Sequence, residues 1–429
     1  MFRYLWVDVL VADRRLAVVG GGWAGIAAAL EAAQRGHVVT LFEMAPQLGG
    51  RSRGVEVAGH SLDNGQHILI GAYVETLALL RTVGVDPDHA FLRTPLTVTY
   101  PDGTGLRLRG GSPGPAFAAA VLRRQGWRLR ERLGLLAAAA GWVASGFRCD
   151  GTLTVATLTH RLPKAIRDDL IDPLCVAALN TPSVDASARV FLRVLKDALF
   201  AAPGSADLLL PRASLSALLP EPAAHRLQAL GATIRLQQRV DTIVAEGDGW
   251  RVDGERFEQV VLATTPVEAA RLTLALASDW SRAAGALRYE PIVTVYLRGH
   301  GVLLAAPILA LRSSDFAPSQ FVLDRGQLGG PPGLLAFVIS GAQPWVERGM
   351  DAVLRATLDQ ARAALGLTLE HVQTLTEKRA TFRCTPALHR PPMRIAAGLH
   401  AAGDYVDGPY PATLEGAVRS GLNAVRPLA

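Results

Sequence analysis

The fold is decided by one stretch near the start of the chain, Leu16-Ala17-Val18-Val19-Gly20-Gly21-Gly22-Trp23-Ala24-Gly25. Four apolar residues of this kind form a buried parallel strand, and the GxGxxG pattern that follows opens a helix in dinucleotide-binding folds. Gly20 permits the tight turn, Gly22 lets a pyrophosphate approach the backbone, and Gly25 lets the helix pack closely on the strand. The N-terminus of that helix supplies free N–H groups for phosphates. The pattern therefore predicts a Rossmann-type α/β domain that binds a dinucleotide.

A second strand is predicted over residues 38–42, and it ends at Glu43. The alanine-rich stretch up to Arg35 is typical of the connecting helix, with Gly36 where that helix stops. Glu43 can accept hydrogen bonds from both ribose hydroxyls of an adenosine, and its charge would repel a 2′-phosphate. We therefore do not expect NADP in this site.

Composition narrows the class of protein. The chain has 429 residues, enough for two or three domains. Hydrophobic residues make up 49% of it and the mean hydropathy is +0.22, which supports a large core and hints at an additional apolar surface or cavity. The net charge of +6 comes without a concentrated basic run, so nucleic acid is not an expected partner. Cys149, Cys175 and Cys384 are far apart and form no metal-spaced cluster with histidine, so no metal site is expected.

The next segment resembles a second flavin signature. Gly49-Gly50-Arg51 closely follows Glu43 and resembles a motif of the flavin amine oxidase superfamily, whose members include monoamine oxidases, phytoene desaturases and protoporphyrinogen oxidases. The resemblance implies an α/β fold with a Rossmann-type FAD-binding domain and an interleaved α+β substrate domain. It also implies that Gly50 lets the chain run against the FAD pyrophosphate, that Arg51 helps to neutralise it, and that backbone near Val240 contacts the adenine. Read alone, the glycines and the arginine could form an ordinary surface turn.

The C-terminal part of the chain resembles the other half of the same flavin site. An apolar strand ends in Gly403-Asp404, and residues 411–421 open a helix. The resemblance implies that the Gly403-Asp404 pair contacts the ribityl and pyrophosphate side of FAD. It also implies that Thr413 and Leu414 direct N–H groups at the flavin ring, where a helix N-terminus would stabilise the negative charge of a reduced flavin.

The segment Asp63-Asn64-Gly65-Gln66-His67 narrows the family further. With shorter matches elsewhere, it resembles the squalene-associated FAD-dependent desaturases, a family now described as hydroxysqualene dehydroxylases. The shorter matches lie at residues 177–182, 210–213, 291–297 and 379–382. The resemblance implies reductive dehydroxylation of hydroxysqualene, an apolar isoprenoid alcohol, to squalene in hopanoid biosynthesis. It implies FAD as cofactor, with NADPH or another electron donor, such as a partner reductase, as reductant.

Two other functions stay open. Oxidative desaturation of a carotenoid precursor or another polyisoprene would use the same fold with reversed hydride flow. A flavin-bearing subunit that only binds lipid is a third hypothesis, although a scaffold has no need of ring-facing motifs. Amine oxidation is disfavoured, because the strand predicted over residues 291–297 lacks the lysine that amine oxidases place near the flavin.

The dehydroxylation needs an acid, because hydroxide is a poor leaving group. The resemblance brings the segment up to His67 towards the flavin ring, and a histidine there can carry a proton near neutral pH. His67 is therefore the first catalytic candidate, and Gln66 is expected to contact the cofactor. Tyr405 is a weaker catalytic candidate, as is Tyr410. In the alternative interpretation, His67 and Gln66 only hydrogen-bond the flavin or the backbone.

Residues 117–147 are rich in alanine and leucine and carry five arginines with Trp127 and Trp142. One long amphipathic stretch of this kind suits a helix lying on a membrane surface. The alternative is a solvated helical face with two core tryptophans. Residues 1–15 do not resemble a signal peptide, and residues 133–147 are too short for a spanning helix, which needs roughly 20 residues. We therefore expect a cytoplasmic protein that is peripheral at the inner face of the cell membrane.

The flavin motifs are separated by long stretches that do not repeat the strand–turn–helix pattern, so two interleaved domains are expected. The predicted FAD-binding domain comprises residues 1–72, 203–285 and 394–429. The predicted substrate-binding domain comprises residues 73–202 and 286–393.

Overall fold

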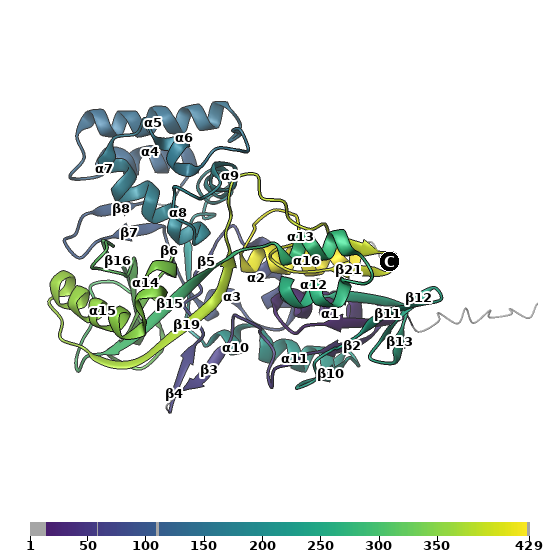
Figure 1. The fold of residues 1–429 in the computed structure, drawn as a ribbon. Helices are drawn as coiled ribbons and strands as arrows, with labels where there is room; N and C mark the ends of the chain where they lie inside the picture. The colour runs from purple at the N-terminus through teal and green to yellow at the C-terminus, as the bar shows by residue number, and fades with distance from the viewer. Residues whose placement is uncertain (1–13, 58, 109–110, 427–429) are drawn as a thin grey trace, which may run out of the picture.

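The computed structural model describes residues 14–57, 59–108 and 111–426, and a six-stranded sheet lies at its centre (Figure 1). In spatial order its strands are β10 (Thr233–Arg235), β2 (Val38–Phe42), β1 (Arg15–Val19), β14 (Gln259–Leu262), β21 (Leu399–Ala401) and β20 (Arg394–Ala396). All pairs are parallel except that of the edge strand β20 with β21. Helix α1 (Trp23–Gln34) connects β1 and β2, so the predicted Rossmann-type α/β domain is confirmed.

The turn between β1 and α1 depends on glycine. Gly20 has a φ of +108°, a conformation that other residues rarely adopt. A Cβ atom on Gly25 would lie 1.8 Å from the carbonyl oxygen of Gly20, so only glycine lets α1 begin this close to β1. Leu16, Ala17 and Val18 of β1 are fully buried because both faces of the sheet are covered.

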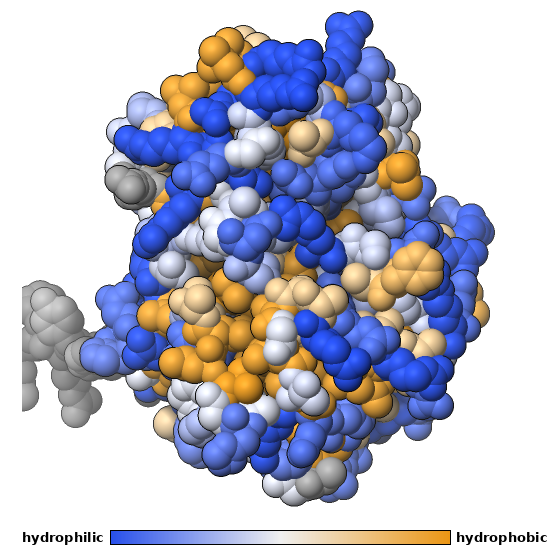
Figure 2. Space-filling view, turned by 90° about the vertical axis from the view of Figure 1, so that its left-hand side faces the viewer, coloured by the Kyte–Doolittle hydropathy of each residue, from blue (hydrophilic) through white to orange (hydrophobic). Residues whose placement is uncertain are grey.

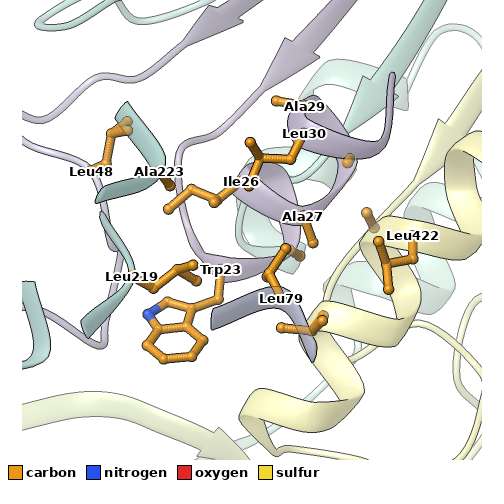
Figure 3. Packing of buried hydrophobic residues seen from close by; sticks show 14 of the residues in the cluster. Trp23, Ile26, Ala27, Ala29, Leu30, Leu48, Leu79, Leu219, Ala223 and Leu422 are labelled. Atoms are coloured by element: carbon orange, nitrogen blue, oxygen red, sulfur yellow. The ribbon is translucent and has the colours of Figure 1, made fainter. Parts of the chain in front are cut away.

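One face of this sheet packs against α1, α2 (Val74–Thr82), α11 (Pro220–Ala229) and α16 (Leu414–Val425). Figure 3 shows α1 inside this core, with Ala27 directed towards Leu422 of α16. The two helices approach closely because small residues meet: a Cβ atom on Gly421 would lie 2.1 Å from the carbonyl oxygen of Ala24. The other face packs against β11 (Ile243–Glu246), β12 (Gly249–Val252), β13 (Glu255–Phe257), α12 (Pro266–Thr273) and α13 (Ser278–Gly285).

A second, five-stranded antiparallel sheet forms a separate layer. In spatial order its strands are β16 (Ile308–Ala310), β17 (Phe321–Asp324), β18 (Leu334–Ile339), β15 (Tyr289–Arg298) and β19 (Glu370–Phe382). Helices α14 (Gln343–Arg348) and α15 (Met350–Leu365) cover one face of it. A helical layer consists of α4 (Pro113–Arg123), α5 (Leu129–Ala144), α6 (Val155–Thr159), α7 (Lys164–Ile166), a π-helical turn (Arg167–Ile171), α8 (Asp172–Leu179) and α9 (Ala188–Leu199).

Smaller elements connect these layers. The sheet β5 (Leu69–Ile70), β9 (Leu208–Pro211) and β6 (Phe91–Thr94) is antiparallel, as are the hairpins β3 (Gly54–Val57) with β4 (His60–Asp63) and β7 (Thr97–Thr99) with β8 (Gly105–Arg107). Short helices are α3 (Pro87–Ala90), α10 (Leu215–Leu218) and a 3-10 turn (Gly326–Leu328).

The five-stranded sheet is inserted in the chain between strands of the six-stranded sheet. Strands of the six-stranded sheet come from residues 15–42, 233–262 and 394–401, and the five-stranded sheet comes entirely from residues 289–382. Strand β9, which falls in the predicted FAD-binding range, nevertheless pairs with β6 of the predicted substrate-binding range. The domain boundaries stay a prediction.

The expectation of one long amphipathic stretch over residues 117–147 is wrong. The stretch forms two helices, α4 and α5, separated at Arg124–Arg128, where Gly126 has a φ of +87°. Trp127 is buried and donates from its indole N–H to the Asp169 carboxylate at 3.1 Å, and Trp142 packs against the same core. The tryptophans therefore match the alternative interpretation of core residues. In Figure 2 the upper part of the view, where these helices lie, mixes hydrophilic with hydrophobic residues, and a larger hydrophobic area lies below it.

Across residues 14–57, 59–108 and 111–426, no helix is both long and apolar enough to cross a membrane. The prediction that residues 1–15 are not a signal peptide concerns a segment of which residues 1–13 lie outside the described part of the chain.

Candidate active site

The sequence motifs surround one cavity of about 590 Å³, whose wall takes residues from both large sheets. Every predicted cofactor-binding and catalytic residue except Gly25 and Tyr410 lines it: Gly20, Gly22, Glu43, Gly50, Arg51, Gln66, His67, Val240, Gly403, Asp404, Tyr405, Thr413 and Leu414. Gly25 lies behind the wall, where it permits the close contact of α1 with the turn after β1.

Two glycine segments meet face to face at one end of the cavity. The backbone N–H of Gly49 donates to the carbonyl of Gly21 at 2.8 Å, and Gly22 and Gly49 form a parallel β-bridge. A Cβ atom on Gly50 would lie only 3.1 Å from the Cα of Gly22. The result is a stretch of bare backbone at the N-terminus of α1, which is the kind of surface that binds phosphate.

Glu43 is held rigidly at the edge of this cradle. One carboxylate oxygen accepts from the backbone N–H of Gly21 and the other from that of Ala45, both at 2.7 Å. Each oxygen keeps a further lone pair for a ribose hydroxyl, because a carboxylate offers about four acceptor sites. The contact of Glu43 with an adenosine ribose stays a prediction.

Arg51 and Asp404, which are 353 residues apart, form an ion pair of 2.7 Å in the cavity wall. The guanidinium of Arg51 also donates to the carbonyl oxygen of Ala380 on β19 at 2.6 Å. One side chain thus connects the N-terminal motif, the C-terminal motif and the five-stranded sheet. Its cationic guanidinium follows directly after the glycine pair in the cavity wall.

Three hydroxyl groups in the cavity wall have buried oxygen atoms without a hydrogen-bond partner among the described residues: those of Ser52, Tyr289 and Tyr405. Burial raises the pKa of Tyr289 to about 12 and also raises the pKa of Tyr405, so both phenols stay protonated at neutral pH. Unpaired buried polar groups are costly, and a polar ligand in the cavity would satisfy them. Together with the glycine cradle and the cationic Arg51, they fit a bound dinucleotide such as FAD.

His67 differs from expectation in its charge. Burial and the nearby Arg51 guanidinium lower the pKa of His67 to about 4, against a hydrogen bond to the Asn64 backbone that raises it. The imidazole is therefore neutral at pH 7, not a ready proton carrier. Gln66 donates to the hydroxyl of Tyr296 at 2.8 Å.

The sequence reasoning missed Tyr289 and Glu377, which line the cavity from β15 and β19. Glu377 accepts a hydrogen bond of 3.3 Å from the Asn64 side chain, so it belongs to the polar surroundings of His67. No motif marks either residue, because both stand on strands whose place beside the cavity is a matter of tertiary packing.

The C-terminal helix points its N-terminus at the cavity. The Thr413 side chain caps α16 by accepting from the backbone N–H of Gly416 at 2.9 Å, and Thr413 and Leu414 both line the wall. Val240 also lines the wall, and its carbonyl accepts a hydrogen bond of 2.8 Å from Arg271. Tyr410, the other weaker catalytic candidate, is not among the lining residues. Within the described residues no group of three His, Cys, Asp or Glu side chains is placed to hold a metal ion.

Comparison with known proteins agrees with this geometry. Residues 23–428 match the family of flavin containing amine oxidoreductases. The chain is 28% identical to hydroxysqualene dehydroxylase of Rhodopseudomonas palustris, over 95% of this chain and 96% of the relative. It is 24% identical to 15-cis-phytoene desaturase of an Oncidium hybrid cultivar, over 94% of this chain and 76% of that one.

Solved structures share the fold at lower identity. An oxidoreductase from Methanosarcina mazei superposes with a TM-score of 0.75 at 16% identity, covering 96% of this chain and all of the other. Cyclohexylamine oxidase from Brevibacterium oxydans superposes with a TM-score of 0.70 at 17% identity, covering 97% and 98%. The chain therefore belongs to the flavin containing amine oxidoreductase family and is an FAD-dependent oxidoreductase with a flavin amine oxidase-like fold.

Proposed function

We propose that this enzyme removes the hydroxyl group of hydroxysqualene reductively and yields squalene, as a step of squalene and hopanoid biosynthesis. The observation that carries the proposal is the match over nearly the full length of two bacterial hydroxysqualene dehydroxylases, each 28% identical to this chain. The segment Asp63–His67, on which the resemblance rests most, contributes Asn64, Gly65, Gln66 and His67 to the cavity wall.

The residues that would hold FAD are distributed around the cavity by role. Gly20, Gly22 and Gly50, with Gly25 behind them, would form the phosphate cradle. Glu43 and Val240 would contact the adenosine. Arg51, Gly403 and Asp404 would contact the pyrophosphate and the ribityl chain. Gln66, Thr413 and Leu414 would contact the flavin ring. Reduced FAD, when bound, would supply the hydride that replaces the hydroxyl group.

The protein must add one proton and exclude water. When the C–O bond breaks, the hydroxyl takes a proton and leaves as water, and the allylic carbon accepts a hydride. We assign the donation of this proton to His67. Its pKa of about 4 makes the protonated imidazole a strong acid, and only a small fraction of the molecules carry that proton at pH 7. Tyr405, whose raised pKa keeps its proton in place, would hydrogen-bond the departing hydroxyl. Activity that rises as the pH falls from 7 towards 4 is the result expected from this assignment.

Part of the cavity wall suits a hydrocarbon chain, because its side chains are apolar: Ile68, Ala177, Ala178, Ile292 and Leu375. A long isoprenoid buries favourably against such side chains, at about 25 cal/mol per Å² of apolar surface. A charged amine would gain little from them, and β15 carries no lysine.

We further propose that α5 meets the anionic inner face of the cell membrane, which would make the enzyme cytoplasmic and peripheral. Four exposed apolar residues recur at helical spacing along α5: Leu129, Leu133, Ala137 and Ala140. Residues 113–148 carry six arginines and a single acid, Glu131. Apolar and cationic side chains side by side suit an interfacial helix, and binding to vesicles that contain anionic lipid but not to neutral ones tests this.

A second candidate function is oxidative desaturation of a polyisoprene, favoured by the 24% identity to phytoene desaturase over 94% of the chain. The deciding experiment is an anaerobic reaction of dithionite-reduced protein with hydroxysqualene, following the flavin spectrum and extracting the lipid. Return of the oxidised flavin spectrum together with squalene supports dehydroxylation. Recovered alcohol and a flavin that stays reduced refute it, and the oxidised enzyme is then assayed with polyisoprene hydrocarbons.

NADPH, or a reductase, is proposed as the physiological reductant, and anaerobic bleaching of the flavin by NADPH alone distinguishes the two.

A further inference from the structure

A buried polar network lies beside the cavity and joins three distant parts of the chain. The hydroxyl of Tyr296, on β15, accepts from Gln66 Nε2 at 2.8 Å and donates to the backbone carbonyl of Asp63 at 2.9 Å. Arg325, which follows β17, donates to Gln66 Oε1 at 3.3 Å and lies 3.6 Å from the Asp63 carboxylate. That carboxylate also accepts from the backbone N–H of Leu215 at 2.9 Å.

The surroundings of this network are apolar. Asp63, Tyr296 and Arg325 are 4%, 1% and 9% exposed. The hydrophobic cluster around Tyr296 consists largely of leucines: Leu62, Leu208, Leu210, Leu323, Leu328 and Leu334. Placing an ion pair in such a cluster costs desolvation, and well-packed apolar residues of similar volume are often as stabilising or more so. Stability alone is therefore a weak explanation for the network, and fixing one backbone conformation is the other use that buried ion pairs have in some proteins.

The network holds a single short segment from both ends. Asp63 is the last residue of β4, Gly65 turns the chain with a φ of +88°, and Gln66 is the next residue. Tyr296 and Arg325 contact the segment before and after the turn, yet neither is among the residues that line the cavity. A displacement at either contact would therefore be passed to the following residue, His67.

We propose that Tyr296 and Arg325 are positioning residues that set the place of Gln66 and His67 in the flavin cavity. Tyr296 does so by bridging Gln66 to the backbone of Asp63, and Arg325 by binding both side chains. The inference rests on the proposed function only where His67 is given a role in proton transfer. The position of the segment itself is measurable without substrate.

The test uses the FAD-loaded enzyme and the variants Y296F and R325M, with R325K as the conservative variant. His67 is followed through its imidazole NMR signal, assigned by its loss in H67Q, and the flavin through its visible absorption. We expect Y296F and R325M to shift both signals and to lower kcat by about ten- to a hundredfold with little change in KM, because small misplacements of reacting groups have effects of this size. R325K is expected to restore part of the loss.

The matched control is R124M, which removes another buried arginine of an ion pair, 3.4 Å from Asp169, in the helical layer. It is expected to lower stability without moving the His67 signal or the flavin band. The proposal is overturned if Y296F leaves both signals unchanged, or if R124M shifts them as much. Y296F loses only one oxygen atom and decides the matter even if R325M does not fold. If the wild type does not convert hydroxysqualene, the proposed function fails, while the two spectroscopic signals still decide this inference.

Discussion

Replacing Glu415 should loosen the flavin site, because this residue fixes the start of α16 to α2. Its side chain is completely buried and accepts from the backbone N–H groups of Glu75 at 3.1 Å and Thr76 at 2.9 Å. It also accepts from the Thr76 hydroxyl at 2.7 Å and from the Arg419 guanidinium at 2.7 Å. Glu415 thus caps α2 from the first turn of α16, directly after Leu414 in the cavity wall.

The expected magnitude follows from these contacts. Removing one partner of a buried charge pair lowers the free energy of unfolding by about 3–5 kcal/mol. The loss of the cap of α2 would by itself cost about 1 kcal/mol, and most of that cost is already contained in this range. We therefore expect E415A to lower the free energy of unfolding by roughly 4 kcal/mol. E415Q keeps the volume but turns an amide NH₂ towards N–H donors, and it should lose about 2 kcal/mol, the worth of one hydrogen bond to a charged group.

Urea unfolding followed by circular dichroism measures these losses, and the flavin content of the purified variants reports on the site. The control is D279N, which removes the exposed ion pair of Asp279 with Arg282 on the surface of α13. That pair should be worth less than about 1 kcal/mol. If E415Q is as stable as D279N and keeps its flavin, Glu415 does not hold the two helices as inferred.

Three further predictions follow from single contacts. G25A should fail to fold or lose flavin, because its Cβ would lie 1.8 Å from the oxygen of Gly20, and soluble flavin-loaded G25A would contradict this. R51A should weaken FAD binding about tenfold, or 1.4 kcal/mol, because Asp404 loses the cation that lies 2.7 Å from it. A fluorescence titration measures the affinity, and an unchanged value would exclude a role of Arg51 in binding FAD. The pKa of His67 in the flavin-free folded protein should be about 4, below the 6.5 of an unfolded chain. As the pH drops from 6.5 towards 4, the unfolded chain takes up this proton before the folded protein does, so the free energy of unfolding falls. The fall should be smaller in H67Q. An NMR titration midpoint near 6.5 for His67 in the folded protein would refute the lowered pKa.

Local patterns were sufficient for the strands and helices next to the cofactor motifs. A strand of four apolar residues, a glycine turn and a terminal acid are short-range features, and β1, α1 and β2 occur where the pattern predicts them. The same reasoning was wrong for residues 117–147, since composition does not reveal that the chain breaks at Gly126 and turns Trp127 into the core. It also could not foresee the pairing of β9 with β6, because strand pairing between distant segments depends on how the layers pack.

The sequence by itself determined the dinucleotide-binding α/β domain and the motifs that the flavin family shares, because glycine-dependent turns and strand-end acids have local physical causes. Only the tertiary structure decided which other groups surround the cavity and in what charge state. Tyr289 and Glu377 reach it from positions on β15 and β19 that lie outside the segments matched in the sequence. The charge of His67 depends on burial and on Arg51, and the place of its segment depends on Tyr296 and Arg325. Desolvation and distance act between residues hundreds of positions apart, so their effect on a side chain appears only when the chain is folded.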